Sequence, residues 1–265
     1  CEWQIEEGTD ALVPCGTTGE SATLDYDEHK RVIDLCIEVA KGRVPVIAGT
    51  GSNATYEAIE LTLYAQKAGA DAALVVTPYY NKPTQEGMVQ HFKAIHDATE
   101  IPIVLYNVPG RTAADLSAES VARLAELPRI VGIKDASNDL TRPAKTRILA
   151  GEDFVQLSGE DATVIPFLGN GGHGCISVTA NIAPRLLAEL HDLWEAGDWV
   201  KARAINDRLM PLHGALFAET SPSPSKYAAS LLGMGQNEVR LPLVVVGKET
   251  EAKVRSAMQH AGLIN

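Results

Sequence analysis

The sequence predicts a parallel α/β fold, a (β/α)8 barrel of the TIM type, followed by a C-terminal helical domain. The first observation is a set of short, almost continuously apolar runs, which are typical of strands covered on both faces. The second is the helix-patterned sequence between most of these runs, as in "SAESVARLAEL", which opens on Ser117 as a predicted N-cap. The third is the spacing of the runs, roughly 20 to 35 residues, which matches the unit length of a barrel of about 250 residues.

Seven apolar runs are the predicted strands, and they cover residues 11–15, 44–49, 72–78, 101–109, 130–134, 154–159 and 174–180. A doubly wound open sheet would alternate in the same way, but the chain carries no GxGxxG fingerprint, so we favour the barrel. Seven strands are one short of a closed barrel, and the opening "CEWQIEEG" resembles the end of a helix. We therefore expect a first β/α unit of roughly 30 residues to be missing from this chain.

Helical patterns dominate the last third of the chain. They begin at "PRLLAELHDLWEAG" and continue to "TEAKVRSAMQHAGL". The stretch "LPLVVVGK" is apolar, but its proline and glycine predict a connector rather than another strand. We predict a catalytic barrel over residues 1–196 and a helical domain over residues 197–265.

Composition excludes several classes of partner and cofactor. The net charge of −11 and the isoelectric point near 5.1 argue against nucleic acid or an anionic membrane as the main partner. No apolar run has the length of a membrane span, so we expect a soluble, cytoplasmic protein. The cysteines show no CxxC spacing and the histidines no HExxH motif, so we expect free thiols and no metal cofactor.

Lys134 stands out because it ends a predicted strand, in "IVGIKDAS". Alternation along that strand puts Ile130, Gly132 and Lys134 on one face, and barrel enzymes place their active sites at the carboxyl ends of the strands. Burial favours the neutral form of an amine, which is the form that attacks a carbonyl carbon to give a Schiff base. From position alone, an ion pair with Asp135 or an amine extended to the rim explains this lysine equally well.

Neighbouring motifs favour the chemical explanation. The strand in "IPIVLYNVPGRT" points Tyr106 inward at the height of Lys134, and Arg111 follows in the next loop. A phenol can relay protons, and a guanidinium can hold a carboxylate with two hydrogen bonds. In "PCGTTGES", Thr17 and Thr18 follow another predicted strand, where hydroxyl and backbone N–H groups suit a carboxylate or an oxyanion.

The order of these motifs resembles a known family. With "GTTGE", "VTPYYNKP", "YNVPGRT", "GIKDAS" and "GGHGCISVTAN", the chain is similar to the dihydrodipicolinate synthase family of pyruvate-dependent class I aldolases from Thr9 onward. The resemblance implies a barrel with a C-terminal helical domain, assembled as a homotetramer built from dimers. It also implies a lyase that condenses pyruvate with aspartate 4-semialdehyde to 4-hydroxy-tetrahydrodipicolinate, in diaminopimelate and lysine biosynthesis, with no cofactor beyond the covalent pyruvate imine.

The resemblance also assigns roles to individual residues. Lys134 matches the lysine that forms the imine. Thr18, Tyr106 and Tyr80 match the proton relay, with Tyr80 reaching into a neighbouring subunit. The matched substrate-binding positions are Thr17 and Thr18 for pyruvate, Arg111 for the carboxylate of aspartate semialdehyde, and Gly159 and Ile176 along the pocket.

Two further expectations concern regulation and alternative functions. Many members are inhibited by L-lysine at an interface cleft, and the matching positions are Ala22, His29, Asn53, Glu57 and Tyr79, although Tyr26 replaces a frequent histidine. A lyase for N-acetylneuraminate or another 2-keto acid would share Lys134 and Tyr106, while Thr17 with Thr18 and "NVPGRT" favour the synthase. A non-catalytic barrel that binds pyruvate or lysine without turnover is the alternative from a different class.

Overall fold

The computed structural model describes residues 1–265, which divide into two compact units. One unit, called here the sheet unit, comprises residues 11–16 and 26–176. The other, called the helical unit, combines residues 1–10, 17–25 and 177–265. The boundary predicted at residue 197 falls between α9 and α10, which both belong to the helical unit.

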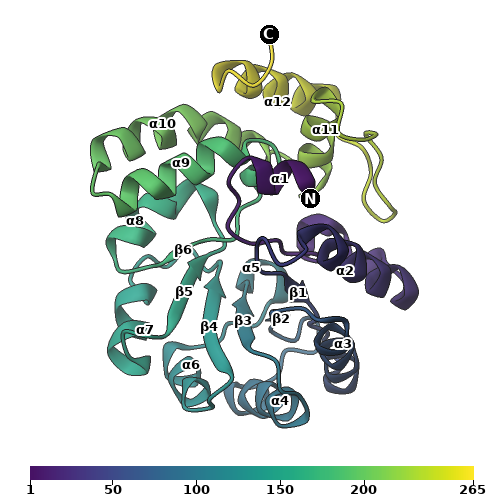
Figure 1. The fold of residues 1–265 in the computed structure, drawn as a ribbon, viewed down its shortest axis with the longest axis vertical. Helices are drawn as coiled ribbons and strands as arrows, with labels where there is room; N and C mark the ends of the chain where they lie inside the picture. Colours follow the sequence, from purple (N-terminus) through teal and green to yellow (C-terminus); the bar gives the residue numbers. More distant parts are fainter. The chain divides into compact units, whose positions relative to one another are not determined.

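The sheet unit is built on six parallel strands, and each strand pairs with the next one in the sequence. The strands are β1 (Ile47–Gly49), β2 (Ala72–Val76), β3 (Ile103–Asn107), β4 (Ile130–Asp135), β5 (Val155–Ser158) and β6 (Gly174–Cys175). The helices are α2 (Tyr26–Ala40), α3 (Thr55–Ala68), α4 (Gln85–Ala98), α5 (Pro109–Thr112), α6 (Ala118–Ala125), α7 (Arg142–Ala150), the turn η3 (Asp161–Thr163) and α8 (Val164–Gly169). Figure 1 shows α3, α4, α6 and α7 along the outside of the strands. The parallel α/β architecture that the sequence predicts is confirmed.

Alternation along the strands separates two apolar clusters. Ile103 and Leu105 of β3 join a large core, called here the outer core, which also holds Phe92 of α4. Val104 and Tyr106 of the same strand join a smaller cluster, called here the inner cluster, which comprises Leu74, Val104, Tyr106, Val108 and Ala136. The outer core therefore packs the helices against the sheet, and the opposite face of the sheet holds the inner cluster.

Two predicted strands are shorter than expected. Residues 11–15 form only an isolated parallel bridge, between Leu12 and Val46. Pro14 has no N–H to donate and Cys15 has a left-handed backbone (φ 56°), so the ladder ends there. Of residues 174–180, only Gly174 and Cys175 form a strand, β6, and Thr179–Asn181 form the turn η4. The connector predicted at "LPLVVVGK" is confirmed, since no strand forms there.

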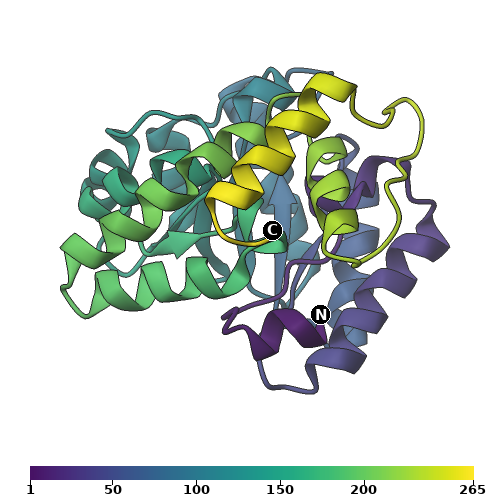
Figure 2. The ribbon, with the colours of Figure 1, turned by 90° about the horizontal axis from the view of Figure 1, so that it is seen from above.

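The helical unit contains α1 (Glu2–Glu6), the short turns η1 (Thr17–Gly19), η2 (Ser21–Thr23) and η4 (Thr179–Asn181), and the helices α9 (Pro184–Glu195), α10 (Trp199–Ala215), α11 (Ser223–Leu231) and α12 (Lys248–His260). Figure 2 shows α9 beside α10, with α12 also against α10. Their shared core includes Leu187, Leu209, Leu212 and Met258. No helix in residues 1–265 is long and apolar enough to span a membrane.

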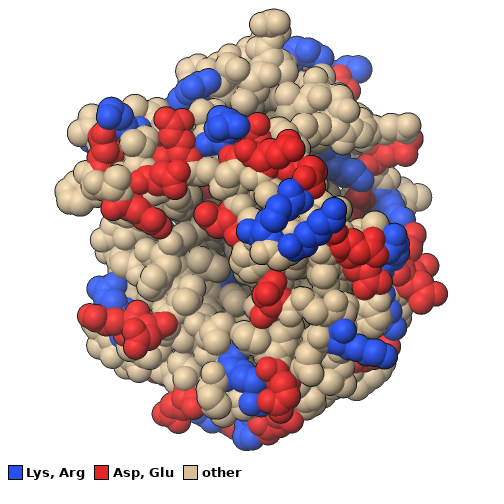
Figure 3. Space-filling model, in the orientation of Figure 1, with Lys and Arg blue, Asp and Glu red and all other residues tan.

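Acidic and basic side chains lie interspersed over the face drawn in Figure 3.

Of the four cysteines, Cys1 is exposed, Cys15 and Cys36 are buried, Cys175 is partly buried, and all are free thiols. No group of three or more His, Cys, Asp or Glu side chains is placed to hold a metal ion.

Candidate active site

Tyr106 and Lys134 face each other at the carboxyl ends of two adjacent strands. They are partners in the β3–β4 register, and the Lys134 Nζ lies 4.3 Å from the centre of the Tyr106 ring. Tyr106 is 8% exposed and belongs to the inner cluster, and Lys134 is half-buried. An amine over the face of an aromatic ring is held in place by a cation–π contact when it is charged. The sequence therefore brings an amine and a phenol together in an apolar setting.

The alternation predicted for β4 is correct at Lys134 and wrong at the start of the strand. Ile130 packs in the same outer core as Ile133, while Val131 packs against the inner cluster. The cause is a register shift, because Ile103 pairs with Ile130 but the next residue, Val104, pairs with Gly132. One extra residue on β4 reverses the faces before it.

Gly159 makes room for Lys134. A Cβ atom added at Gly159 would lie 2.7 Å from the Cβ of Ala136 and 3.0 Å from the Cε of Lys134. The Gly159 N–H donates to the carbonyl of Asp135 over 2.7 Å, which holds the loop after β5 against the end of β4. A side chain at this position would collide with the lysine stem or its neighbour, so the site depends on glycine here.

The next pair along the strands points away from Lys134. Asp135 pairs with Asn107, and the Asn107 Nδ2 donates to the Oδ2 of Asp135 over 3.1 Å and to the Oδ1 of Asp115 over 2.9 Å. Asp135 also accepts from the backbone N–H of Ser137 over 2.9 Å, and a guanidinium nitrogen of Arg142 lies 3.7 Å from its carboxylate. Asp135 is thus committed to partners other than Lys134.

Acidic side chains and a thiol lie within electrostatic reach of Lys134. Burial raises the pKa of Glu160, and so does the charge of Asp161, while Lys134 and Arg111 lower it. Burial also raises the pKa of the Cys175 thiol well above its ordinary value, with Asp161 adding to the shift and Lys134 opposing it. The sequence prediction missed Glu160 and Cys175. The sequence could have indicated them, because Glu160 follows β5 and Cys175 ends β6, and the carboxyl ends of parallel strands meet at one edge of a sheet.

The other predicted residues lie as follows. Ile176 packs against the inner cluster, and Arg111 is exposed in the short helix α5, directly after β3. Tyr80 is 89% exposed with a left-handed backbone (φ 72°). Thr17 and Thr18 lie in η1 of the helical unit.

Three of the predicted lysine-binding residues, Asn53, Glu57 and Tyr79, form a small polar group in the sheet unit. The Asn53 Nδ2 donates to the carbonyl of Tyr79 over 3.1 Å, and Glu57 accepts from the Ser52 hydroxyl over 2.6 Å. His29 is instead buried, with its Nε2 2.7 Å from the carbonyl of Gly49, and burial lowers its pKa. The remaining predicted residue, Ala22, is exposed in the helical unit.

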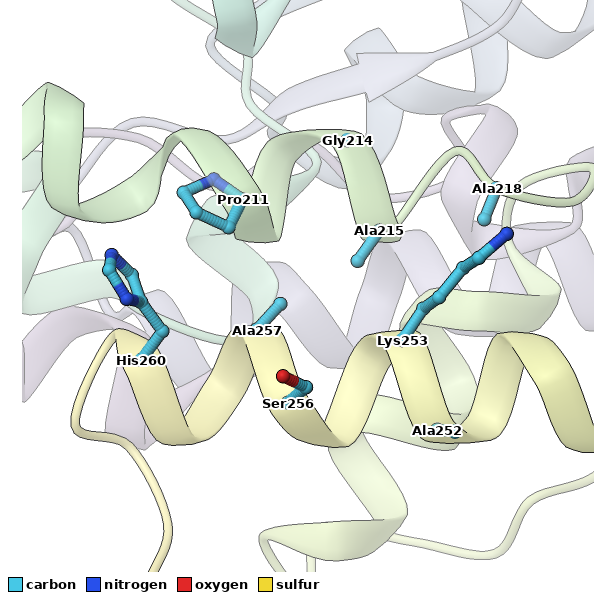
Figure 4. Close-up of a pocket in the computed structure, with 9 residues that line it drawn as sticks. All are labelled: Pro211, Gly214, Ala215, Ala218, Ala252, Lys253, Ser256, Ala257 and His260. Carbon is cyan, nitrogen blue, oxygen red and sulfur yellow. The ribbon is translucent and has the colours of Figure 1, made fainter.

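A hollow of about 680 Å³ lies between α10 and α12. Figure 4 shows its lining, which is formed mainly by small residues such as Gly214, Ala215, Ala252 and Ala257. Lys253, Ser256 and His260 add polar side chains to the lining, and the Lys253 amine pairs with Glu249 over 2.7 Å.

Comparison with known proteins identifies the family. The sequence matches the dihydrodipicolinate synthetase family over residues 1–261. It is 62% identical to a protein of Rhodospirillum centenum and 61% identical to one of Bradyrhizobium diazoefficiens, both named 4-hydroxy-tetrahydrodipicolinate synthase. Each match covers 99% of this chain, and 90% and 89% of the respective relative.

Solved structures give the same result. The chloride-inhibited dihydrodipicolinate synthase of Acinetobacter baumannii, complexed with pyruvate, is 48% identical with a TM-score of 0.97, covering 99% of this chain and 90% of that one. The enzyme of Cyanidioschyzon merolae with lysine bound is 40% identical with a TM-score of 0.96, over the same shares of the two chains. This chain therefore belongs to the dihydrodipicolinate synthetase family.

Proposed function

We propose that this protein is a lyase that condenses pyruvate with aspartate 4-semialdehyde to 4-hydroxy-tetrahydrodipicolinate, for diaminopimelate and lysine synthesis. The observation that carries the proposal is the pairing of Lys134 with Tyr106 at the strand ends. The names of the relatives, and the pyruvate bound in the Acinetobacter baumannii structure, support the choice of substrates.

The reaction begins with attack of the Lys134 amine on the ketone carbon of pyruvate, which expels water and forms an imine. The protonated imine withdraws electrons, so a methyl proton leaves and an enamine forms, with Tyr106 and Thr18 relaying the proton. The enamine carbon then bonds to the aldehyde carbon of the semialdehyde, whose carboxylate Arg111 binds. The amine of that substrate finally attacks the imine carbon, which closes the ring and releases Lys134.

Borohydride trapping tests this chemistry. Reduction of the protein with pyruvate should add the mass of a reduced pyruvyl group on Lys134, and Lys134→Ala should show none. Lys145→Ala, which removes an exposed lysine of α7, is the matched control and should be labelled like the wild type. A wild-type protein that yields no adduct would reject the imine mechanism. Turnover of N-acetylneuraminate instead of aspartate semialdehyde would identify the alternative lyase.

The proposed function also includes an oligomeric state. We propose a homotetramer built from dimers, with Tyr80 entering the partner's site. The support is a group of exposed rings on the sheet unit, in which Tyr26 is 41% exposed, Tyr56 71%, Tyr79 39% and Tyr80 89%. Aromatic side chains exposed together are typical of protein interfaces.

Inhibition by L-lysine is proposed for the group of Asn53, Glu57 and Tyr79. The carboxylate of Glu57 suits the ammonium groups of lysine, and the Cyanidioschyzon merolae enzyme was solved with lysine bound. Millimolar lysine should lower the rate, and Tyr26→His should strengthen the inhibition by supplying the imidazole common in relatives. Equal rates with and without lysine would contradict this part of the proposal.

A further inference from the structure

The loop that carries Thr17 and Thr18 is anchored through the residue that follows it. Gly16 and Gly19 flank the two threonines, so the backbone has few restraints of its own. The Glu20 N–H donates to the carbonyl of Thr17 over 3.1 Å, and the Glu20 carbonyl accepts from the Thr23 N–H over 2.9 Å. Glu20 therefore connects η1 to η2 through hydrogen bonds of both its N–H and its carbonyl.

The Glu20 side chain is fixed by residues more than 200 positions later in the chain. Its carboxylate pairs with the Lys226 amine of α11, and its Oε1 accepts from the backbone N–H of Arg240 over 2.9 Å. The Arg240 guanidinium in turn donates to the carbonyl of Thr23 over 2.9 Å. The side chain of Glu20 is only 10% exposed, and all these residues lie in the helical unit.

The backbone of Glu20 shows that these contacts impose a conformation. It is left-handed (φ 55°, ψ 32°), a region that residues other than glycine seldom adopt without support. Burial works to raise the pKa of Glu20, but the Arg240 N–H and the Lys226 charge lower it below its usual value. The anchor is thus an ionised carboxylate, held on both oxygens.

We infer that Glu20 and Lys226 are positioning residues, through which α11 holds Thr17 and Thr18 in the geometry that binds pyruvate and relays protons. This inference rests on the proposed function, because the roles of the two threonines come from it. Preorganised groups lose less free energy on substrate binding, and a displacement of about 1 Å can cost roughly a hundredfold in rate. The C-terminal helices would then contribute to catalysis as well as to stability.

Three substitutions test the inference. Lys226→Met removes the charge and keeps the length of the stem, Lys226→Arg keeps the charge, and Lys201→Met breaks an exposed pair with Asp198 in the same unit. We expect Lys226→Met to lower kcat/KM for pyruvate roughly tenfold to a hundredfold at a temperature well below its Tm. Lys226→Arg should restore most of the activity, and Lys201→Met should match the wild type.

Amide hydrogen exchange without substrate gives a second readout. Peptides covering residues 16–24 should exchange faster in Lys226→Met and Glu20→Gln than in the wild type. Unchanged exchange, or a Tm that falls while kcat/KM stays at the wild-type value, would overturn the inference. Failure of the proposed function is read separately, from a wild-type protein that forms no pyruvate adduct, and the exchange measurement still decides whether the anchor exists.

Discussion

Gly159 is the residue at which the smallest change should disturb the site most. A methyl group there would lie 3.0 Å from the Lys134 Cε, so Gly159→Ala should displace the amine and slow adduct formation with pyruvate by roughly tenfold to a hundredfold. Gly214→Ala in α10 is the control, because an added Cβ would meet nothing within 4 Å. The rate of borohydride-trapped adduct measures both variants, and equal rates would contradict the steric argument.

His91 should make the fold sensitive to acid. It is 5% exposed, its Nδ1 lies 3.0 Å from the Thr55 hydroxyl, its Nε2 has no partner, and burial lowers its pKa from 6.5 to about 4. Between pH 6.5 and 4, the unfolded chain binds a proton at His91 that the folded state does not. The free energy of unfolding should therefore fall as the pH drops from about 6.5 to 4. The loss should approach roughly 3 kcal/mol.

Unfolding in urea at several pH values checks this effect. His91→Gln keeps a polar group near Thr55 and should show a smaller loss of unfolding free energy between pH 6.5 and 4. His260→Gln, at an exposed position, should follow the wild type. A His91→Gln curve parallel to that of the wild type would assign the acid sensitivity to other groups.

At the scale of elements, the polar network behind β3 and β4 should hold the two strand ends together. Asn107 is fully buried and Asp135 is 9% exposed, and each has its polar atoms engaged. Asp135→Ala leaves Asn107 and Arg142 short of a partner and should lower the free energy of unfolding by about 3 kcal/mol. Asp139→Asn, at a more exposed contact of Arg142, should cost far less. Chemical denaturation measures both, and equal losses would show that the buried network adds nothing.

Element types could be predicted from the sequence where the signal is local. Continuous apolar runs identify β2 to β5, and a serine before an apolar period identifies α6, whose Ser117 hydroxyl accepts from the Ser120 N–H. The strand predicted at residues 11–15 is reduced to an isolated bridge, because its length depends on its partner and on the backbone at Cys15. A run of apolar letters does not contain that information.

In the candidate site too, features set within one strand could be predicted, and features set by strand pairing could not. Period-2 alternation within each strand predicts that Tyr106 and Lys134 share a face, and the register makes them partners. The reversed faces of Ile130 and Val131 could not be predicted, because the bulge exists only once β3 and β4 are paired. Glu160 and Cys175 were missed for a related reason, since their approach to Lys134 depends on the order of strands in the sheet. The catalytic and binding roles of the site residues, Tyr80 and Arg111 included, stay predictions.

At the scale of the whole molecule, the proposed dimer can be tested by mixing inactive variants. If Tyr80 acts in the partner's site, Lys134→Ala and Tyr80→Phe each inactivate a homodimer, but a mixed dimer contains one intact site. Chains unfolded and refolded together should recover about a quarter of the wild-type activity. Co-refolded Lys134→Ala and Tyr106→Phe are the control, because both residues belong to one chain's site. Equal recovery in the two mixtures would place Tyr80 in its own subunit's site.

The order of segments along the chain also affects how the protein can form during synthesis. Residues 11–16 and 26–176 supply the sheet unit described above, and its strands pair in the order in which they are made. The helical unit needs residues 1–10 and 17–25, which are made before most of the sheet unit, and residues 177–265, which are made after it. The threonine loop must therefore wait for Lys226 and Arg240 before it acquires its anchor, so a nascent chain can hold a formed sheet long before its substrate-binding loop is set.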